Sequence, residues 1–156
     1  MATSGLMLMA RGAAMQTALS KLFETRAIHK RYVAVVDGHM ASADWQLIDA
    51  PIALDWPNRP LRIINANGKP SKTRWRAVHY NADSHTTRVE LEPITGRSHQ
   101  LRVHLRALGH PILGDALYAP ADVQAKAMRL QLHANQLRFV HPADGAQMAF
   151  ENAPLF

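Results

Sequence analysis

The sequence predicts a single α+β domain with a mixed, mainly antiparallel sheet. Segments with the alternating pattern and β-branched content of strands outnumber segments with helical periodicity. Successive strands are joined by short turns, which connect antiparallel neighbours rather than parallel ones. The 156 residues suffice for one domain with its own core, and no repeat, low-complexity tract or linker divides them.

The first fifty residues are predicted to form a strand, a helix and two further strands. An apolar run at 4–10 suits a buried strand, and 12–26 has helical periodicity. Residues 30–36 alternate and are rich in β-branched side chains, and 45–50 is a further candidate strand. The helical residues expected to pack inward are Met15, Leu19, Leu22 and Phe23.

Residues 51–72 have the composition of a loop. They carry four of the nine prolines, together with asparagines and a glycine, which all favour turns. A loop of this length in a compact domain is usually functional or mobile. Its basic side chains are Arg59, Arg62, Lys69 and Lys72.

The second half of the chain returns to strands. Residues 73–80 and 86–92 are predicted to form a hairpin, and a helix that ends near Gly109 follows them. The segments expected after this helix are an irregular stretch at 111–120, a short helix at 122–128 and closing strands at 130–140 and 147–151.

The chain is basic, with 18 Lys and Arg against 12 Asp and Glu and a formal charge of +6. Its pI near 10.2 is typical of nucleic-acid binders, although many small proteins without that role share it. The absence of cysteine excludes disulfides, thiol catalysis and cysteine-based zinc sites. The apolar run at 6–10 is too short to span a membrane and lacks a basic leader, so we expect a cytoplasmic protein without a membrane partner.

The most informative segment is 93–106, which reads Pro-Ile-Thr-Gly-Arg-Ser-His-Gln-Leu-Arg-Val-His-Leu-Arg. It follows a strand-like alternation and opens an amphipathic helix. Ser98 is the expected N-cap, and Gly109 is the expected C-terminal stop. The leucines that recur at helical spacing and are expected to pack inward are Leu101, Leu105 and Leu108.

The same segment gathers basic side chains on a different face of the predicted helix. A solvated charged face is the ordinary interpretation of such a pattern. Here no acid lies between Glu92 and Asp115, so the predicted helix has no partner of its own for these cations. The pattern therefore favours a site for a polyanion. The residues concerned are Arg97, His99, Arg102 and Arg106.

Four segments resemble the RluA-type pseudouridine synthases. Residues 94–104, Ile-Thr-Gly-Arg-Ser-His-Gln-Leu-Arg-Val-His, resemble the third signature motif of this family, and 30–36 resembles the second. Residues 2–6 resemble the tail of the first motif, which in the family reads His-Arg-Leu-Asp-x-x-Thr-Ser-Gly. The segment 132–134, with His141-Pro, resembles the closing strand. The matches run in order along the chain, so the resemblance implies one catalytic domain over 1–156.

The resemblance also implies a fold and a substrate. The family has a curved central sheet, with helices and loops flanking a cleft for RNA. Asp55-Trp-Pro-Asn-Arg-Pro and Gly68-Lys-Pro resemble the branch that modifies both large-subunit ribosomal RNA and tRNA anticodon stem-loops. We therefore expect stem-loop RNA as the partner, with no DNA, and a monomer, as the family resemblance suggests.

One departure from the family pattern affects catalysis. The nucleophilic aspartate of the first motif would stand immediately before the residue that aligns with Met1, so the sequence does not include it. The arginine of the same motif is also absent. We expect a catalytic domain without its N-terminal part, which does not isomerise uridine by itself.

The family reaction breaks the bond from ribose C1′ to the base nitrogen, turns the base and rejoins it through carbon, with no redox change and no cofactor. The resemblance implies that Arg102 pairs with the aspartate and keeps it ionised. It also implies that Tyr32 stacks on the uracil and serves in proton transfer. Without the resemblance, Arg102 would be interpreted as a solvated cation and Tyr32 as a half-buried strand residue.

Further substrate contacts are predicted around this pair. Arg97 and His99 are interpreted as phosphate or shape contacts, and Leu132 as a contact to the uracil. Asp115 follows a glycine in a predicted turn, so we reject it as a substitute nucleophile. Basic residues that are weaker candidates, each with solvated charge as the alternative, are Lys30, Arg31, Arg59 and Lys69.

The nine histidines raise the question of a metal. None of them forms the i, i+4 pair of a zincin helix, so we predict no metal site. Two alternatives to the enzyme remain open. A non-catalytic RNA-binding protein predicts salt-sensitive RNA affinity without turnover. A histidine nuclease predicts strand scission, although no acid–base pair is spaced to support it.

Overall fold

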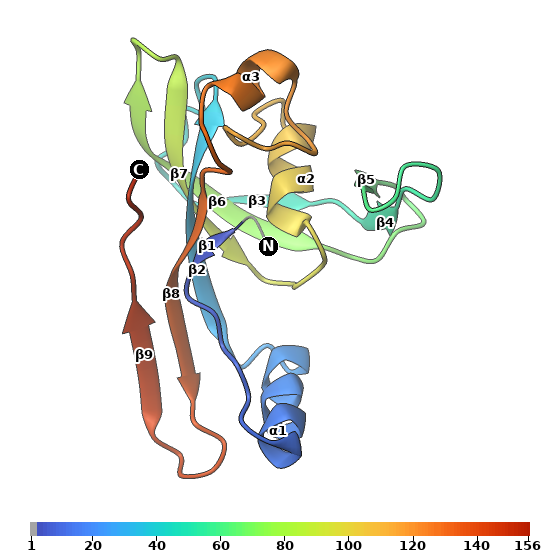
Figure 1. Cartoon of the computed structure of the whole chain (residues 1–156), viewed down its shortest axis with the longest axis vertical. Helices are drawn as coiled ribbons and strands as arrows, with labels where there is room; N and C mark the ends of the chain where they lie inside the picture. Colours follow the sequence, from blue (N-terminus) through green and yellow to red (C-terminus); the bar gives the residue numbers. More distant parts are fainter. Residues whose placement is uncertain (1–2) are drawn as a thin grey trace.

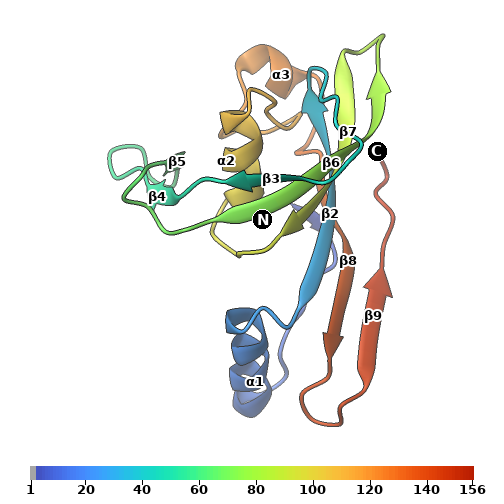
Figure 2. The same cartoon turned by 180° about the vertical axis from the view of Figure 1, so that it is seen from behind.

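The computed structural model describes residues 3–156, so Met1 lies outside the described residues, as does Ala2, the first residue of the segment that resembles the tail of the first motif. The elements are β1 (Ser4–Gly5), α1 (Ala13–Glu24), β2 (His29–Asp37), β3 (Gln46–Asp49), β4 (Ile52–Leu54), β5 (Arg62–Ile64), β6 (Lys72–Asn81), β7 (Thr86–Pro93), α2 (Gln100–Ala107), α3 (Ala121–Ala125), β8 (Leu132–Val140) and β9 (Gln147–Glu151). Figures 1 and 2 show this arrangement from opposite sides.

The predicted α+β class is confirmed. The main sheet has the strand order β1-β8-β2-β7-β6-β3, and β9 also pairs with β8. All of these pairs are antiparallel except the short parallel pair of β1 with β8. The predicted hairpin is the β6–β7 pair, and the predicted strands at 30–36, 45–50, 130–140 and 147–151 correspond to β2, β3, β8 and β9.

The core lies on one face of this sheet. Residues at alternate positions of a strand share a face, and Ala34, Val36, Val89 and Leu91 pack together against Leu101 and Leu105 of α2. A second cluster joins α1 to the far end of β2 and β8, through Leu19, Ile28, Leu137 and Phe139. Between the pairs Arg31–Gln136 and Tyr32–Ala134, β8 contains one extra residue. This bulge shifts the alternation of β8 by one position, so the β8 residues of both clusters point to the same face of the sheet.

Two predictions near the N-terminus are corrected. Of the predicted strand at 4–10, only Ser4–Gly5 forms a strand. The backbone N–H of Leu6 still donates to the carbonyl of Ala134 at 2.9 Å, and the side chains of Leu6 and Leu8 pack against the α1 cluster. Phe23, predicted to pack inward from the first helix, is 44% exposed. It lies one residue from the end of α1 and faces the open space between α1 and the sheet.

The predicted loop at 51–72 is more ordered than its composition indicated. It contains the two-stranded β4–β5 sheet, which is separate from the main sheet. This segment, here called the arm (residues 51–70), projects to the side of the molecule (Figure 1). Its base is fixed because Ile52 packs with Val103 of α2 and with Tyr118. A Cβ at Gly68 would lie 2.5 Å from the Ile52 carbonyl carbon, so this close approach requires glycine.

None of the helices in residues 3–156 is long and apolar enough to cross a membrane.

Candidate active site

The signature segment forms α2, but its buried residues are not confined to the predicted leucine face. All residues from Gln100 to Leu105 are buried, because one side of the helix meets β6 and β7 and the other meets β5 of the arm. Leu108, predicted to pack inward, is 41% exposed. The helix begins after His99, whose backbone is left-handed (φ 57°), and Ser98 does not cap it. Gly109, also left-handed (φ 83°), follows the helix end as predicted.

Arg102 pairs with an acid outside the helix but within the protein, so this cation is not left for an external polyanion as its pattern suggested. Its guanidinium donates from Nε to Oδ2 of Asp115 at 2.8 Å and from Nη2 to Oδ1 at 2.5 Å. The Arg102 residue is 9% exposed and the Asp115 residue 1%. A paired arrangement of this kind satisfies both buried charges. The bidentate pair does not use Nη1, which remains available as a donor toward a second acceptor.

Asp115 has no capacity left for nucleophilic chemistry. Besides the two bonds from Arg102, its Oδ1 accepts the backbone N–H groups of Leu117 and Tyr118 at 3.0 and 3.1 Å. The carboxylate is therefore buried and occupied by donors. This geometry supports the rejection of Asp115 as a substitute nucleophile and gives it a positioning role for Arg102.

Gln100 connects the loop that bears Arg97 to the sheet. Its side-chain oxygen accepts from the backbone N–H of Arg97 at 3.0 Å and from the hydroxyl of Thr95 at 2.7 Å. Its amide group donates to the carbonyl of Lys72 at 2.9 Å and to Oγ1 of Thr73 at 3.0 Å. One buried amide thus holds the loop, α2 and β6 in a fixed arrangement.

His104 continues this network as a neutral imidazole. Thr73 Oγ1 accepts from Gln100, so its hydroxyl hydrogen is available for Nδ1 of His104 at 2.9 Å. The other ring nitrogen, Nε2, then carries the proton and donates to the carbonyl of Ala50 at 3.0 Å. Burial lowers the pKa of His104, which agrees with the neutral form.

A cleft of about 1070 Å³ opens beside this network, between α1 and the loop that precedes α2. Tyr32 and Lys30 contribute to its surface from β2, and Arg97 from the loop. Since Tyr32 and Lys30 are two residues apart on one strand, both side chains point to the face that α1 and α2 cover at either end. The further charged residues of its wall are Glu24, Arg26, Arg31, Arg74, Glu92 and Arg138.

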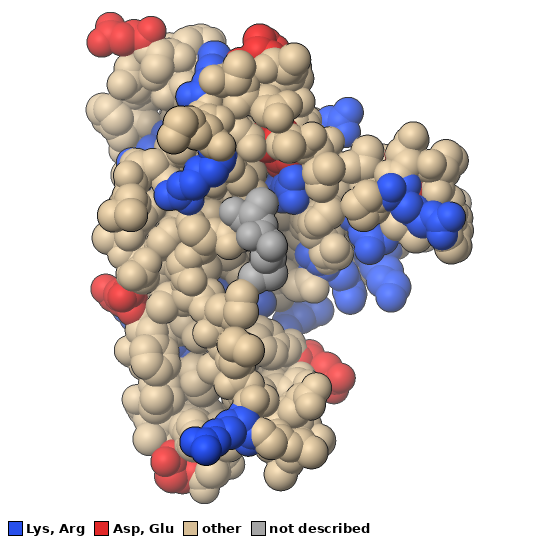
Figure 3. Space-filling view, in the orientation of Figure 1, with Lys and Arg blue, Asp and Glu red and all other residues tan. Residues whose placement is uncertain are grey.

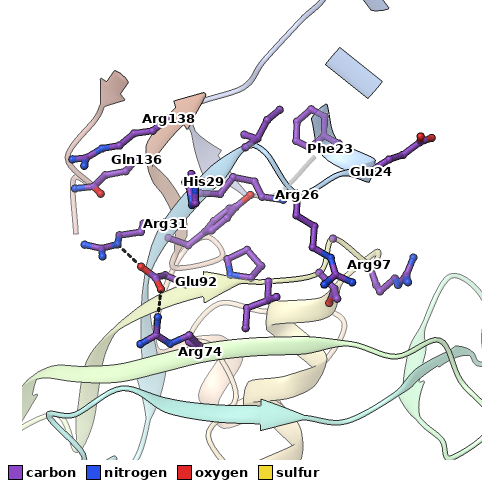
Figure 4. Close-up of a pocket in the computed structure, with 17 residues that line it drawn as sticks. Phe23, Glu24, Arg26, His29, Arg31, Arg74, Glu92, Arg97, Gln136 and Arg138 are labelled. Carbon is purple, nitrogen blue, oxygen red and sulfur yellow. Dashed lines mark hydrogen bonds and ion pairs between the residues drawn. The ribbon is translucent and has the colours of Figure 1, made fainter. Parts of the chain in front are cut away.

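Acidic partners for the basic side chains of the cleft are concentrated on one side of it. Glu92 pairs with Arg31 at 2.7 Å and with Arg74 at 3.2 Å, across three neighbouring strands. Figure 4 shows Arg97 on the opposite side of the cleft from these pairs. Figure 3 shows Lys and Arg side chains gathered between the arm and α1. The cleft therefore has the electrostatic character of a polyanion site.

Burial tunes two groups of this cleft. It raises the pKa of the Tyr32 hydroxyl, which therefore keeps its proton at neutral pH and can donate a hydrogen bond. Burial lowers the pKa of the Lys30 ammonium, whose Nζ lies 5.3 Å from the centroid of the Phe23 ring. A partly desolvated ammonium has more to gain from a phosphate than a solvated one.

The other predicted contacts lie away from the cleft wall. His99 Nδ1 lies 2.7 Å from the hydroxyl of Tyr118, and its pKa is lowered by burial and by Arg102 and Arg62. Leu132 belongs to the main core cluster, so its predicted contact with uracil stays a prediction that this burial does not favour. Arg59 lies at the end of the arm, in the turn between β4 and β5.

Sequence reasoning missed the wall formed by Arg74, Glu92 and Arg138. These residues lie on β6, β7 and β8, and only the sheet order brings them together. One feature of the sequence could have identified Asp115 as the partner of Arg102, because Asp115 is the first acidic residue after Glu92.

Comparison with known proteins identifies the family. A family model described as RNA pseudouridylate synthase matches residues 1–107. The chain belongs to the RNA pseudouridylate synthase family. The matched residues include β2, β6, β7 and all of α2, and with them Tyr32, Arg97 and Arg102. The prediction made from the signature motifs is confirmed at the level of the family.

Several pseudouridine synthases are similar over nearly the whole chain. The dual-specificity RNA pseudouridine synthase RluA of Escherichia coli (strain K12) is 50% identical over 152 residues, which cover 97% of this chain and 68% of that protein. The protein of the same name from Yersinia pestis is 48% identical, over 97% of this chain and 73% of its own length. This chain is therefore shorter than these pseudouridine synthases.

Solved structures of the family have the same fold. Human RNA Pseudouridylate Synthase Domain Containing 1 matches with a TM-score of 0.80 and 30% identity, over 93% of this chain and 62% of that one. Human RNA Pseudouridylate Synthase Domain Containing 4 matches with a TM-score of 0.70 and 26% identity. The mixed, mainly antiparallel sheet is thus the sheet of pseudouridylate synthase domains.

Proposed function

We propose that this domain binds stem-loop RNA in the basic cleft and isomerises uridine to pseudouridine when it is joined to the aspartate of the first motif. The observation that carries the proposal is the convergence of Tyr32, Lys30 and Arg97 on one cleft, while Asp115 clamps Arg102 in the helix that follows the Arg97 loop. In this reaction the bond from C1′ to N1 breaks and a bond from C1′ to C5 forms. A proton leaves C5 and N1 gains one, so the isomerisation is balanced.

The roles proposed for two residues follow from their environments. Asp115 fixes the Arg102 guanidinium and leaves Nη1 free of the pair, so that Arg102 can meet a second carboxylate and hold it ionised. Tyr32 offers a protonated hydroxyl and an aromatic ring at the cleft surface. Such a ring supports an extruded uracil by stacking. Neither role requires a metal or cofactor.

We propose large-subunit ribosomal RNA, a tRNA anticodon stem-loop, or both as substrates. Extracting a base from a loop requires less free energy than extracting it from a duplex, which favours loop uridines. The Asp55–Pro60 segment, which resembles the dual-specificity branch, belongs to the arm that projects from the domain (Figure 1). We further propose that the protein acts in the cytoplasm as a monomer, without a DNA or membrane partner.

A second candidate function is RNA binding without turnover. The sequence given does not include the motif aspartate, and the structure offers no replacement at Asp115, which is buried and saturated with donors. The basic cleft would remain competent to bind RNA. Both functions therefore predict affinity for RNA, but only the first predicts conversion of uridine to pseudouridine.

A chimaera distinguishes them. The N-terminal segment of the Escherichia coli relative that precedes the matched region is fused before Met1, and pseudouridine is measured in ribosomal and tRNA stem-loops by mass spectrometry. We expect the chimaera to convert uridine, and the same chimaera with the motif aspartate changed to alanine to bind RNA without conversion. A folded chimaera that binds RNA but leaves every uridine unchanged would favour the second function. Strand scission would instead indicate a nuclease.

A further inference from the structure

The arm exposes a large aromatic side chain that the fold does not use. Trp56 is 66% exposed and belongs to none of the hydrophobic clusters formed by the described residues. Trp45 and Trp75, by contrast, are both half-buried against the main sheet. An exposed tryptophan on a projecting hairpin contributes little to stability, and tryptophan is among the side chains that contribute most to binding when a ligand covers them.

Trp56 is already stacked on one face. The Arg59 guanidinium carbon lies 4.4 Å from the centroid of a Trp56 ring. With this face covered and two thirds of the residue exposed, the remaining area is the opposite ring face and the edge. The pair offers a flat π-surface backed by a positive charge, which suits a nucleobase next to its phosphate.

The turn that presents this pair is closed by hydrogen bonds. The Asn58 side-chain amide donates to Oδ2 of Asp55 at 3.0 Å, and the backbone N–H of Leu61 donates to the carbonyl of Asn58 at 3.0 Å. The backbone N–H of Asp55 donates to the carbonyl of Leu61 at 3.0 Å. A pre-organised turn loses little conformational entropy when a ligand binds.

The base of the arm is fixed relative to Arg102. The hydroxyl of Tyr118 accepts the backbone N–H of Arg62 in β5 at 3.0 Å, and the Arg102 guanidinium lies over the Tyr118 ring at 4.9 Å. One side chain thus contacts both the arm and the arginine of the active site. RNA held by the arm would be held at a defined position relative to the cleft.

We propose that Trp56 and Arg59 form a stacking site for an unpaired base of the RNA, outside the catalytic cleft. The charge of the surrounding segment identifies the occupant, since 51–72 carries four basic residues and only one acid, Asp55. Such a balance fits a polyanion better than a protein surface or a second basic copy of this chain. Because bases in a duplex are already stacked on their neighbours, the site selects unpaired ones. The inference rests on the proposed binding of RNA.

The test measures the affinity of the 156-residue chain for two labelled RNAs by fluorescence anisotropy at low ionic strength. One RNA is a stem closed by an unpaired loop, and the other is a fully paired duplex of equal length. The variants are Trp56→Ala and Trp56→Phe, and the control is Met128→Ala, which truncates a fully exposed apolar side chain outside the arm. Urea unfolding of each variant verifies that the fold is intact.

We expect Trp56→Ala to weaken stem-loop binding by about fivefold or more. Trp56→Phe, which keeps an aromatic face, and Met128→Ala should stay within about twofold of the original chain. Duplex affinity should be unchanged in all of them. Equal stem-loop affinity in Trp56→Ala, or an equal loss on both RNAs, would overturn the stacking site and leave the proposed function intact. An original chain that binds neither RNA would overturn both.

Discussion

Two arginine–aromatic pairs in this protein have similar geometry and opposite environments. Arg102 lies 4.9 Å from the ring centroid of Tyr118, and Arg59 lies 4.4 Å from that of Trp56. Tyr118 is 4% exposed, whereas Trp56 is 66% exposed. Only the buried arginine has a bidentate carboxylate, that of Asp115. The comparison shows that burial decides whether such a pair is a structural element or a surface for a ligand.

The two arginines differ because one is withdrawn from water and the other is surrounded by it. A guanidinium withdrawn from water requires a fixed counter-charge and hydrogen-bond acceptors, and these also fix its position. A guanidinium at the end of the arm is stabilised by water and remains available to a phosphate or a base. Under the proposed function, the buried pair would pre-organise the active site, and the exposed pair would contribute binding energy.

Removing the counter-charge from the buried pair should have the largest effect. We expect Asp115→Asn to lower the free energy of unfolding by about 3–5 kcal/mol, because it leaves Arg102 buried with an uncompensated charge. Urea unfolding measures the change. The control Asp83→Asn, at an exposed turn, should stay within about 0.5 kcal/mol. A loss equal to that of the control would mean that water reaches Arg102, and the contrast between the two pairs would disappear.

Lowering the pH should reduce the free energy of unfolding by a smaller amount, through a buried histidine of α2, the helix that contains Arg102. Burial lowers the pKa of His104 in the folded state, so the unfolded chain binds the proton more readily. The contribution of His104 is therefore fully present above its unfolded pKa of about 6.5 and is lost as the pH falls below it, by at most about 1.4 kcal/mol per pH unit. Urea unfolding between pH 7.5 and 5.5 measures this slope.

His104→Gln should reduce that slope, leaving the part due to His99, whose pKa burial also lowers. The matched change is His79→Gln, at an exposed position of β6, and it should reduce the slope less than His104→Gln does. The arm contains no histidine, so the difference in RNA affinity between Trp56→Phe and Trp56→Ala should be the same at both pH values. An unchanged slope in His104→Gln would contradict the neutral network.

The smallest effect on stability should come from the exposed pair itself. We expect Arg59→Ala to change the free energy of unfolding by no more than about 0.5 kcal/mol, because Arg59 is exposed to water. Its effect should appear in RNA binding instead, as a reduction of about one in the slope of log affinity against log salt. The control is Arg11→Ala, an exposed arginine outside the arm that does not line the cleft and should leave the salt slope unchanged. An unaltered salt slope in Arg59→Ala would indicate that Arg59 serves only to orient Trp56.

Much of the architecture was predictable because it depends on local patterns. The alternation of 30–36, 73–80 and 86–92 predicts strands, and the apolar positions of each strand show which of its faces packs in the core. The resemblance of four segments to family motifs likewise predicted the family. The arm was missed as a hairpin because its strands have three residues each, too few for a periodicity to appear between prolines.

The sequence by itself determined the α+β class, the basic character, the family and the position of the signature helix. Only the tertiary structure decided which side chains of that helix are buried. Periodicity assumes one buried face, but α2 lies between the sheet and the arm, so Arg102 and His104 are buried and Leu108 is exposed. The partner of Arg102 lies thirteen residues further along the chain, where no local pattern connects the two. Long-range packing brings Asp115 to Arg102 and leaves Trp56 exposed on the arm, because burial depends on what the rest of the chain covers.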